Sequence, residues 1–239
     1  MKDNKRNRIL IYCLAFIIPL FMTAVFYLLC HIYPFGDESI LAWDMNRQYI
    51  SYYSYLKTVF SGQNDLFYTF SKTLGGDMPG FCAYYLQNPL LLILLLFPKD
   101  NIVFGIEVLF ALHLAFAGLS CSVMLGRRYG HEPGILIFST AYSFCSYMFA
   151  YISNQLYLPV IILLPLILYF FLEVIEKRRC RIPFTLLLFL AVWANYYQSY
   201  MVMIFLGIIF ISRVIADTKS IRSISDVVIC VLTAVMLDG

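Results

Sequence analysis

Long apolar runs separated by short polar segments form the main pattern of this chain. Residues 9–30 carry no charge, and as a helix they are long enough to cross about 30 Å of hydrocarbon. Each further apolar run predicts another helix in or on a membrane: 81–97, 102–125, 134–152, 157–172, 183–194, 200–212 and the beginning of one more at 227. The pattern therefore predicts an all-α fold, a polytopic transmembrane helix bundle.

The run at 81–97 is interrupted, and the basic residues indicate that it does not cross. Gln87, Asn88 and Pro89 break it, which leaves 90–97, about 12 Å of continuous apolar helix. If this run stays on or dips into the outer face, all other basic clusters fall on the cytoplasmic side, as short basic loops prefer. These clusters are Arg127 with Arg128, the segment 177–181, and Arg213, Lys219 and Arg222.

The beginning of the chain predicts its orientation. Lys2, Lys5, Arg6 and Arg8 precede the first apolar run, but the run exceeds a typical signal peptide and no small-residue cleavage site follows. We therefore expect one transmembrane domain over 1–239, with its amino terminus in the cytoplasm. The first span is predicted at 9–32, a large extracytoplasmic loop with interfacial helices at 33–100, and the remaining spans at 101–239.

Two features of the carboxyl-terminal half leave alternatives open. One helix over 183–212 would fit by length, but it would export Arg213, Lys219 and Arg222. The apolar run that begins at 227 is too short to span a membrane before the sequence stops. We therefore expect the chain to be the amino-terminal portion of a longer protein.

Composition narrows the class further. The chain is 62% hydrophobic, 18% aromatic and 13% charged, which is typical of a protein whose solvent is lipid. Its seven cysteines and three histidines form no C-x-x-C pair, metal spacing or H-E-x-x-H set, so no metal site is predicted. No G-x-x-x-x-G-K-[ST] motif is present, so an ATP-driven pump would need a partner. We expect membrane lipid as a partner and no nucleic acid.

The outer loop contains one helical pattern, at 46–61. Its apolar face consists of Tyr49, Tyr52, Tyr53, Leu56, Val59 and Phe60, and polar side chains take the rest. This is the pattern of a helix in the membrane interface, where tyrosine rings are apolar and their hydroxyls wet. The helix either packs over the bundle or shapes a groove where a lipid headgroup meets a water-exposed substrate. Glycines follow at 75, 76 and 80 and predict a connector or a closing loop.

Asp44 stands at the start of this helix and has two interpretations. Aspartate commonly caps a first helical turn. A carboxylate beside the membrane, partly covered by Trp43 and nearby tyrosines, could also accept a proton from an attacking hydroxyl. The rival acids Asp37 and Glu38 are adjacent and are more typical of a solvated turn.

Two ionisable residues fall inside a predicted span. Glu107 lies near its outer end, where we expect it to snorkel to the interface. His113 lies nearer the middle, where it either lines a polar cavity or is a neutral, hydrogen-bonded histidine. Buried ionisable groups are costly in lipid, by a few kcal/mol on insertion scales, and usually have a partner.

Short strings along the chain resemble the YfhO family of bacterial membrane proteins, in order and over essentially the whole length. They are DMNRQY at 44–49, FSKTLGG at 70–76, AYYL at 83–86, NP at 88–89 before a leucine run ending in FPK, AGLS at 117–120, Asn154, LPL at 164–166, and NYY at 195–197 with Tyr200 and Met201. Many members of that family carry an acidic residue after the Asn154 region, where this chain has Leu158 and Pro159.

The resemblance implies a glycosyltransferase of the GT-C type in the bacterial plasma membrane. Such an enzyme takes a sugar from an undecaprenyl-phosphate-linked donor and places it on an envelope acceptor such as lipoteichoic acid. Asp44 matches the position of a catalytic acid in the first outer loop, as general base or acceptor-orienting carboxylate. Some GT-C enzymes use a divalent cation, which the acids of the loop permit without requiring it.

Further substrate contacts are predicted around Asp44. Arg47, Lys57 or Lys72 would offer charge to the departing lipid phosphate, or would anchor the helix to anionic headgroups. Gln48, Tyr49 and Asn154 are the predicted polar contacts to substrate.

Two other functions remain open. In a lipid-linked sugar flippase or other multi-span transporter, Glu107, His113 and the short spans would line a pathway, with the outer loop as a gate. In a scaffolding subunit no single acid would matter.

Overall fold

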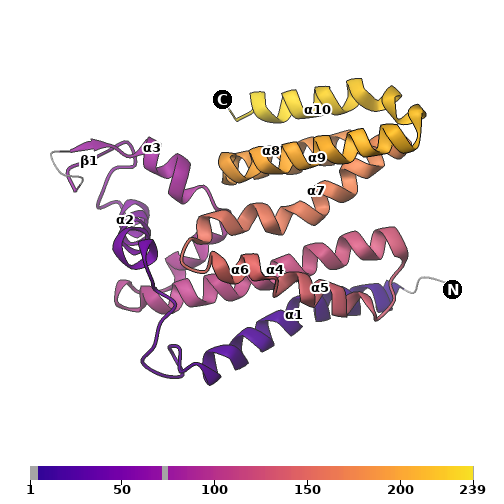
Figure 1. Ribbon diagram of the computed structural model, residues 1–239. Coiled ribbons are helices and arrows are strands. Elements are labelled where there is room, and N and C mark those ends of the chain that lie inside the picture. Colours follow the sequence, from indigo (N-terminus) through magenta and orange to yellow (C-terminus); the bar gives the residue numbers. More distant parts are fainter. Residues whose placement is uncertain (1–4, 72–74, 239) are drawn as a thin grey trace.

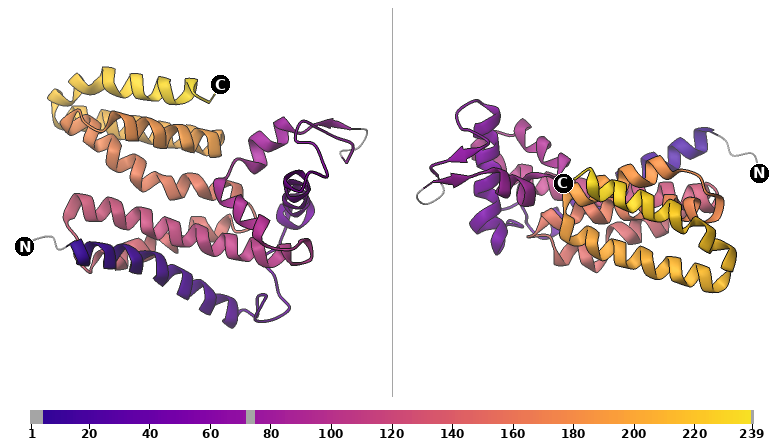
Figure 2. Two further views of the ribbon diagram at one scale, coloured as in Figure 1. Left: turned by 180° about the vertical axis from the view of Figure 1, so that it is seen from behind. Right: turned by 90° about the horizontal axis from the view of Figure 1, so that it is seen from above.

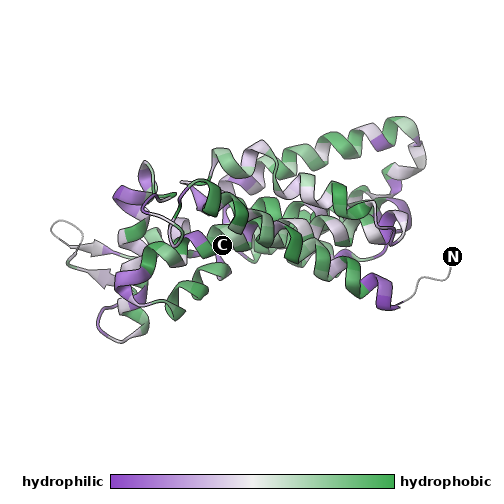
Figure 3. Ribbon diagram, turned by 90° about the horizontal axis from the view of Figure 1, so that it is seen from below, coloured by the Kyte–Doolittle hydropathy of each residue, from purple (hydrophilic) through white to green (hydrophobic). Residues whose placement is uncertain are grey.

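Helices lie side by side between two polar ends in the computed structural model, which describes residues 5–71 and 75–238 (Figure 1). The helices between the ends are mostly hydrophobic, whereas hydrophilic residues gather in the outer loop and near the amino terminus (Figure 3). The bundle helices are α1 (Lys5–Leu29), α4 (Ile102–Tyr129), α5 (Ile135–Ser143), α6 (Ser146–Ala150), α7 (Leu158–Lys177), α8 (Arg181–Ala194), α9 (Tyr196–Ala216) and α10 (Ile224–Met236). The predicted all-α class is confirmed.

The outer loop folds into a compact cap at one end of the bundle (Figure 1). A π-helical turn, Met45–Tyr49, continues into α2 (Ile50–Phe60). A hairpin then pairs two strands of two residues each, β1 (Tyr68–Thr69) and β2 (Gly76–Asp77). Next comes α3 (Pro79–Phe81), a second π-helical turn and the 3₁₀ helix Pro89–Leu96. Shorter 3₁₀ turns occupy Lys99–Asn101, Gln155–Tyr157 and Thr218–Ser223.

Within residues 5–71 and 75–238, four helical stretches are long and apolar enough to span a membrane: Lys5–Leu29, Lys99–Tyr129, Gln155–Lys177 and Tyr196–Ala216. The segments Pro79–Leu86 and Pro89–Leu96 together form a fifth apolar stretch, but they are bent by 93° where they meet. The predicted interruption of the run at 81–97 is therefore confirmed, and we call residues 79–96 the bent segment. That it does not cross stays a prediction.

Two shorter apolar stretches, Ile135–Ala150 and Arg181–Ala194, complete the bundle. The alternative of one helix over 183–212 is wrong, because the chain turns back at Asn195. This residue is extended, with φ −164° and ψ 102°, and its side chain caps α9 by accepting from the backbone N–H of Gln198 at 2.9 Å. Helices α8 and α9 consequently lie side by side (Figure 2).

Helix α4 lies at the centre of the first half of the bundle, where it contacts α1, α5 and α7. Small residues allow this close packing: a Cβ added at Gly118 would come within 2.6 Å of the Ala15 carbonyl oxygen and of Ser143 Oγ. Helix α7 then joins this half to a second apolar cluster, which it forms with α8, α9 and α10.

Ion pairs join the ends of the helices opposite the cap. Glu176 binds Arg128 through two contacts of 2.7 Å and Arg213 at 3.1 Å. Asp226 of α10 binds Arg178 at 2.7 Å and Arg181 at 2.9 Å. The basic clusters thus gather at one end of the bundle, as the sequence predicts, and each acid draws its partners from different helices.

The bent segment is held against α4 by His113. The Leu109 carbonyl accepts from Nδ1 of His113 at 2.8 Å, so we assign the proton to that nitrogen. The other ring nitrogen, Nε2, then accepts a hydrogen bond from Nδ2 of Asn88 at 2.9 Å. The amide oxygen of Asn88, Oδ1, accepts from the backbone N–H of Leu90 at 3.0 Å and thereby caps the 3₁₀ helix. His113 is thus the neutral, hydrogen-bonded histidine of the two interpretations, and it is fully buried.

Replacing Asn88 by alanine is expected to destabilise the fold by about 2–4 kcal/mol. The change removes a helix cap, which costs about 1 kcal/mol, and leaves a buried histidine nitrogen unpaired, which costs about 1–3 kcal/mol. Thermal unfolding of purified protein in lipid nanodiscs would measure the loss. Asn46→Ala, at an exposed position, is the control, and equal stability of the two variants would contradict the assigned contact.

Two native cysteines test the orientation. Cys30 is exposed at the end of α1 next to the cap, and Cys180 is exposed between α7 and α8 among the basic residues. In variants that keep only one of them, a membrane-impermeant maleimide should label Cys30 in intact cells. It should label Cys180 only after permeabilisation. The opposite result would place the cap in the cytoplasm.

Candidate functional site

Asp44 lies at the entrance to the π-helical turn Met45–Tyr49, and its side chain is exposed. It makes no side-chain capping bond, so the capping interpretation is wrong. Trp43 does not cover it either, because its own side chain is 83% exposed. Asp44 itself has helical dihedral angles, φ −67° and ψ −28°, and its carboxylate is exposed and open to a ligand.

Two tyrosine hydroxyls share the surroundings of Asp44. Tyr49 and Tyr85 both lie close enough to interact electrostatically with its carboxylate. Burial, followed by the charges of Tyr85 and Asp44, raises the pKa of Tyr49 well above its usual range. Tyr49 therefore stays protonated, and its hydroxyl donates to Oδ1 of Asn154 at 2.9 Å.

Asn154 precedes the first turn of the Gln155–Lys177 stretch, so this bond joins the cap to the bundle across 105 residues. Gln48 contributes a second contact within the cap, because its Oε1 accepts from the Tyr85 hydroxyl at 3.4 Å. Of the predicted site residues, the fold thus brings together Asp44, Gln48, Tyr49 and Asn154. We call these four residues and Tyr85 the Asp44 cluster.

Tyrosines from distant parts of the sequence surround this cluster. The ring of Tyr85 lies 5.2 Å from that of Tyr49 and 4.9 Å from that of Tyr52, centroid to centroid. The hydroxyls of Tyr84 and Tyr157 are 3.2 Å apart. Together these rings form an aromatic wall between the cap and the ends of α7 and α9, since Tyr84 also contacts Tyr196.

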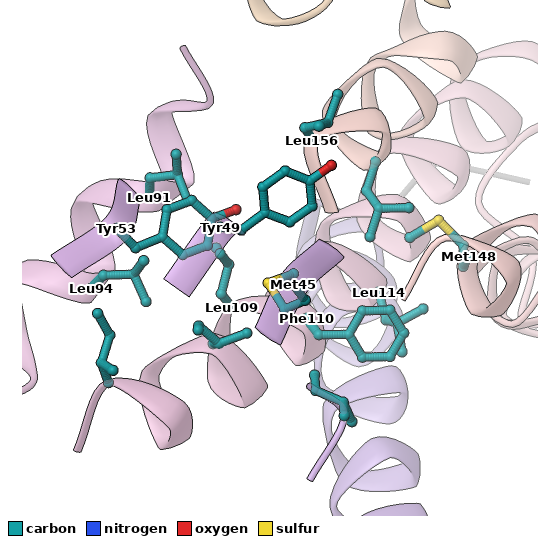
Figure 4. Packing of buried hydrophobic residues seen from close by; sticks show 14 of the residues in the cluster. Met45, Tyr49, Tyr53, Leu91, Leu94, Leu109, Phe110, Leu114, Met148 and Leu156 are labelled. Carbon is teal, nitrogen blue, oxygen red and sulfur yellow. The ribbon is translucent and has the colours of Figure 1, made fainter. Parts of the chain in front are cut away.

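The helix that carries Asp44 is anchored by buried side chains on its other face. Met45, Tyr49 and Tyr53 point into a cluster with Leu91 and Leu94 of the bent segment and with Leu109 and Phe110 of α4 (Figure 4). The predicted apolar stripe is confirmed for Tyr49, Tyr53 and Leu56, which are buried, whereas Phe60 is 60% exposed. This packing fixes the position of Asp44 relative to the bundle.

The three predicted phosphate ligands differ in where the chain places them. Arg47 is exposed, one turn from Asp44. Lys57 instead donates to the carbonyls of Leu94, at 2.8 Å, and Phe97, at the end of the 3₁₀ helix. It lies thirteen residues after Asp44, about 20 Å along the helix. Lys72 lies outside the described residues.

Lys57 therefore has a structural contact that sequence alone did not indicate. Burial and the nearby charge of Lys99 lower the pKa of its ammonium group, but both bonds use its N–H donors. The Leu94 carbonyl also accepts from the backbone N–H of Phe97 at 3.2 Å, so Lys57 is its second donor at the end of the 3₁₀ helix. Lys57 thus fastens the far end of the bent segment to α2.

Asp37 and Glu38 are exposed in a turn, as predicted, where the backbone of Glu38 exchanges hydrogen bonds with His31 and Tyr33. Among the described residues, no group of three or more His, Cys, Asp or Glu side chains is placed to hold a metal ion.

Glu107 does not snorkel to the interface, so this prediction is wrong. Its side chain is fully buried in α4, and neither carboxylate oxygen makes a hydrogen bond of normal geometry. The hydroxyl of Ser39 and the backbone N–H of Ile40 lie near it. The outer loop folds over this end of α4 and thereby closes the route to water.

Tyr84, Tyr85 and Tyr157 are the residues of the wall to which sequence analysis assigned no role. Two of them belong to the AYYL string at 83–86, which was a signal of family resemblance only. Tyr85 lies near Asp44 because of the bend. The sequence indicates the break at Gln87–Pro89 but not its angle of 93°, nor which side chains meet across it.

The fold and this cluster define a multi-span helical membrane protein with a structured cap over one end of its bundle. A family model described as Bacterial membrane protein YfhO matches residues 15–239, so the chain belongs to the YfhO family. The resemblance seen in the short strings is thereby confirmed. No curated protein and no solved structure matches the chain.

Replacing Lys57 by methionine should lower the free energy of unfolding by about 2 kcal/mol, because hydrogen bonds from a charged donor contribute about 1.5–3 kcal/mol. Methionine keeps the apolar stem of the side chain. Lys99→Met is the matched control, since Lys99 is exposed and a surface change of this kind usually stays within about 0.5 kcal/mol. Comparable thermal unfolding of the two variants in nanodiscs would contradict the fastening role.

Proposed function

We propose that this protein is a GT-C-type glycosyltransferase of the plasma membrane. It moves a sugar from an undecaprenyl-phosphate-linked donor to an envelope acceptor such as lipoteichoic acid. The observation that carries the proposal is the exposed Asp44 carboxylate, placed beside polar side chains at the end of a lipid-facing bundle. Membership in the YfhO family agrees with it.

The proposed chemistry requires one base at the acceptor. An acceptor hydroxyl attacks the anomeric carbon of the donor sugar, and the bond from that carbon to the phosphate oxygen breaks. Asp44 takes the proton of the hydroxyl, and the polyprenyl phosphate leaves with the bonding electrons. Gln48 and Asn154 supply amide groups that can hydrogen-bond sugar hydroxyls.

Arg47 is the cation that we assign to the leaving phosphate. It is exposed and lies on the same turn as Asp44, and a guanidinium matches phosphate oxygens with two parallel N–H donors. Lys57 is not part of this proposal, because its donors are directed at backbone carbonyls. Tyrosines of the wall suit the depth of lipid headgroups, where rings are buried and hydroxyls meet water.

The transporter alternative draws support from one observation, the buried and unpaired carboxylate of Glu107. Its second proposed group, His113, is engaged through both ring nitrogens in holding the bent segment. Loss of a flippase would stop the lipid-linked sugar from reaching the outer leaflet but would leave a separate transferase active. The two functions therefore predict different products.

Loss of Asp44 as a base should abolish transfer. In a host deleted for the full-length gene, the wild-type gene should restore sugar on the envelope polymers. Asp44→Asn should reduce it by about 100-fold or more, the usual range for removal of a general base. Asp37→Asn, which changes an exposed rival acid, is the matched control and should restore the sugar fully at equal membrane level.

The leaflet in which the carrier-linked sugar accumulates distinguishes a transferase from a flippase. Transfer predicts that the donor accumulates on the outer leaflet in the deletion, whereas a flippase predicts that it stays on the inner leaflet. Full restoration by Asp44→Asn would overturn the catalytic assignment. Unchanged glycans in the deletion itself would overturn the transferase proposal.

A further inference from the structure

A hollow of about 310 Å³ lies next to the Asp44 cluster on the outer cap. Its walls come from α2, the β1 hairpin and α3, which gather at the same end of the molecule (Figure 1). The hydroxyl of Tyr55 donates to the Asp65 carbonyl at 2.6 Å and fastens one wall to the turn before the hairpin. The lining residues are Ser51, Tyr52, Tyr55, Thr69, Ser71, Met78 and Phe81.

The lining combines aromatic rings with hydroxyl groups. The rings of Tyr52 and Phe81 are 5.2 Å apart and inclined by 46°, so they offer flat apolar surfaces at an angle. Ser51, Thr69 and Ser71 carry hydroxyls, each able to donate one hydrogen bond and to accept others. A pyranose has complementary chemistry, since its ring faces carry C–H groups and its rim carries hydroxyls.

The charge of the hollow selects against phosphate. None of its seven lining residues is ionised at neutral pH, whereas an anionic group needs a cation or several directed N–H donors. Its volume lies at the small end of the range for ligand pockets, about 300–1,000 Å³. One neutral sugar unit therefore suits it better than a charged headgroup or an oligosaccharide.

The hollow is connected to Asp44 along one face of the helix. Ser51 follows Asp44 by seven residues, about 10 Å along the axis, with Gln48 between them. The ring of Tyr52 in the hollow contacts the ring of Tyr85 at 4.9 Å, and Tyr85 bonds to Gln48. A ligand in the hollow would thus extend toward the carboxylate over a continuous surface.

A second, wider hollow of about 650 Å³ adjoins the first. The two share Thr69 and Ser71, and the second adds the side chains of Gln63, Asn64 and Asp65. Hydroxyl and amide groups therefore continue from the first hollow into the second, as a polymer would need.

We infer that the hollow between α2, the hairpin and α3 binds a neutral sugar unit of the acceptor and thereby presents the next unit to Asp44. This inference rests on the proposed transferase function. It assigns Ser51 and Tyr52 to the acceptor and leaves the donor phosphate to Arg47. Of the envelope acceptors, it selects a glycan that carries neutral sugar units, because a polyol-phosphate repeat of lipoteichoic acid would bring an anionic group into a hollow without a cation.

Binding is tested by titrating the full-length protein in nanodiscs with the methyl glycosides of glucose, galactose and N-acetylglucosamine, and with glycerol 3-phosphate. At least one glycoside should bind, and glycerol 3-phosphate should not compete with it. Ser51→Trp, which fills the hollow, should weaken glycoside binding at least 10-fold. Ser51→Ala should weaken it about 2- to 10-fold, as expected for one lost hydrogen bond.

Ser61→Trp is the matched control, since Ser61 is exposed at the end of α2 and does not line the hollow. It should bind as the wild type does. Failure of every glycoside to bind the wild type, or equal binding by Ser51→Trp, would overturn the inference. Asp44→Asn should keep glycoside binding and lose only transfer. A failure of the proposed transferase chemistry can therefore be distinguished from a failure of sugar binding in the hollow.

Transfer kinetics distinguish the source of the sugar. If the hollow holds the acceptor, Ser51→Trp should raise the KM for the acceptor at least 10-fold and leave the KM for the lipid-linked donor unchanged. A change in the donor KM alone would assign the hollow to the donor sugar and overturn the acceptor assignment.

Discussion

The bent segment at 79–96 is fastened at both ends by side chains from other elements, and the position of the cap depends on it. His113 of α4 holds its turn through Asn88, and Lys57 of α2 binds the carbonyls at its far end. In lipid a backbone or side-chain polar group without a partner costs several kcal/mol. These contacts therefore give partners to polar groups at the bend and tie α2 to the bundle.

The same constraint gives the cap its function in our interpretation. Met45, Tyr49 and Tyr53 fix the π-helical turn and α2 against the bent segment and α4. The neighbouring side chains of Asp44, Arg47 and Gln48 are left exposed to water. A rigid helix that is apolar on one side and polar on the other can hold a carboxylate beside a lipid-borne substrate.

The opposite end of the bundle is organised by charge. Glu176 and Asp226 each bind arginines from separate segments, so the turns between helices are joined where the chain meets water. Ion pairs at this end involve the basic clusters from which we predict the membrane orientation. Packing between the two ends is mostly apolar, and among the described residues Glu107 and His113 are the buried acidic and basic side chains that lie there.

The sequence by itself determined the membrane class, the break at Gln87–Pro89 and the apolar stripe of the helix after Asp44, because periodicity and apolar length are local properties. Its short strings also indicated the family. Only the tertiary structure decided that Lys57 binds carbonyls, that Glu107 is buried, and that Tyr85 and Asn154 meet the Asp44 helix. Those contacts join residues up to 105 positions apart. They depend on how whole helices pack, which no local pattern encodes.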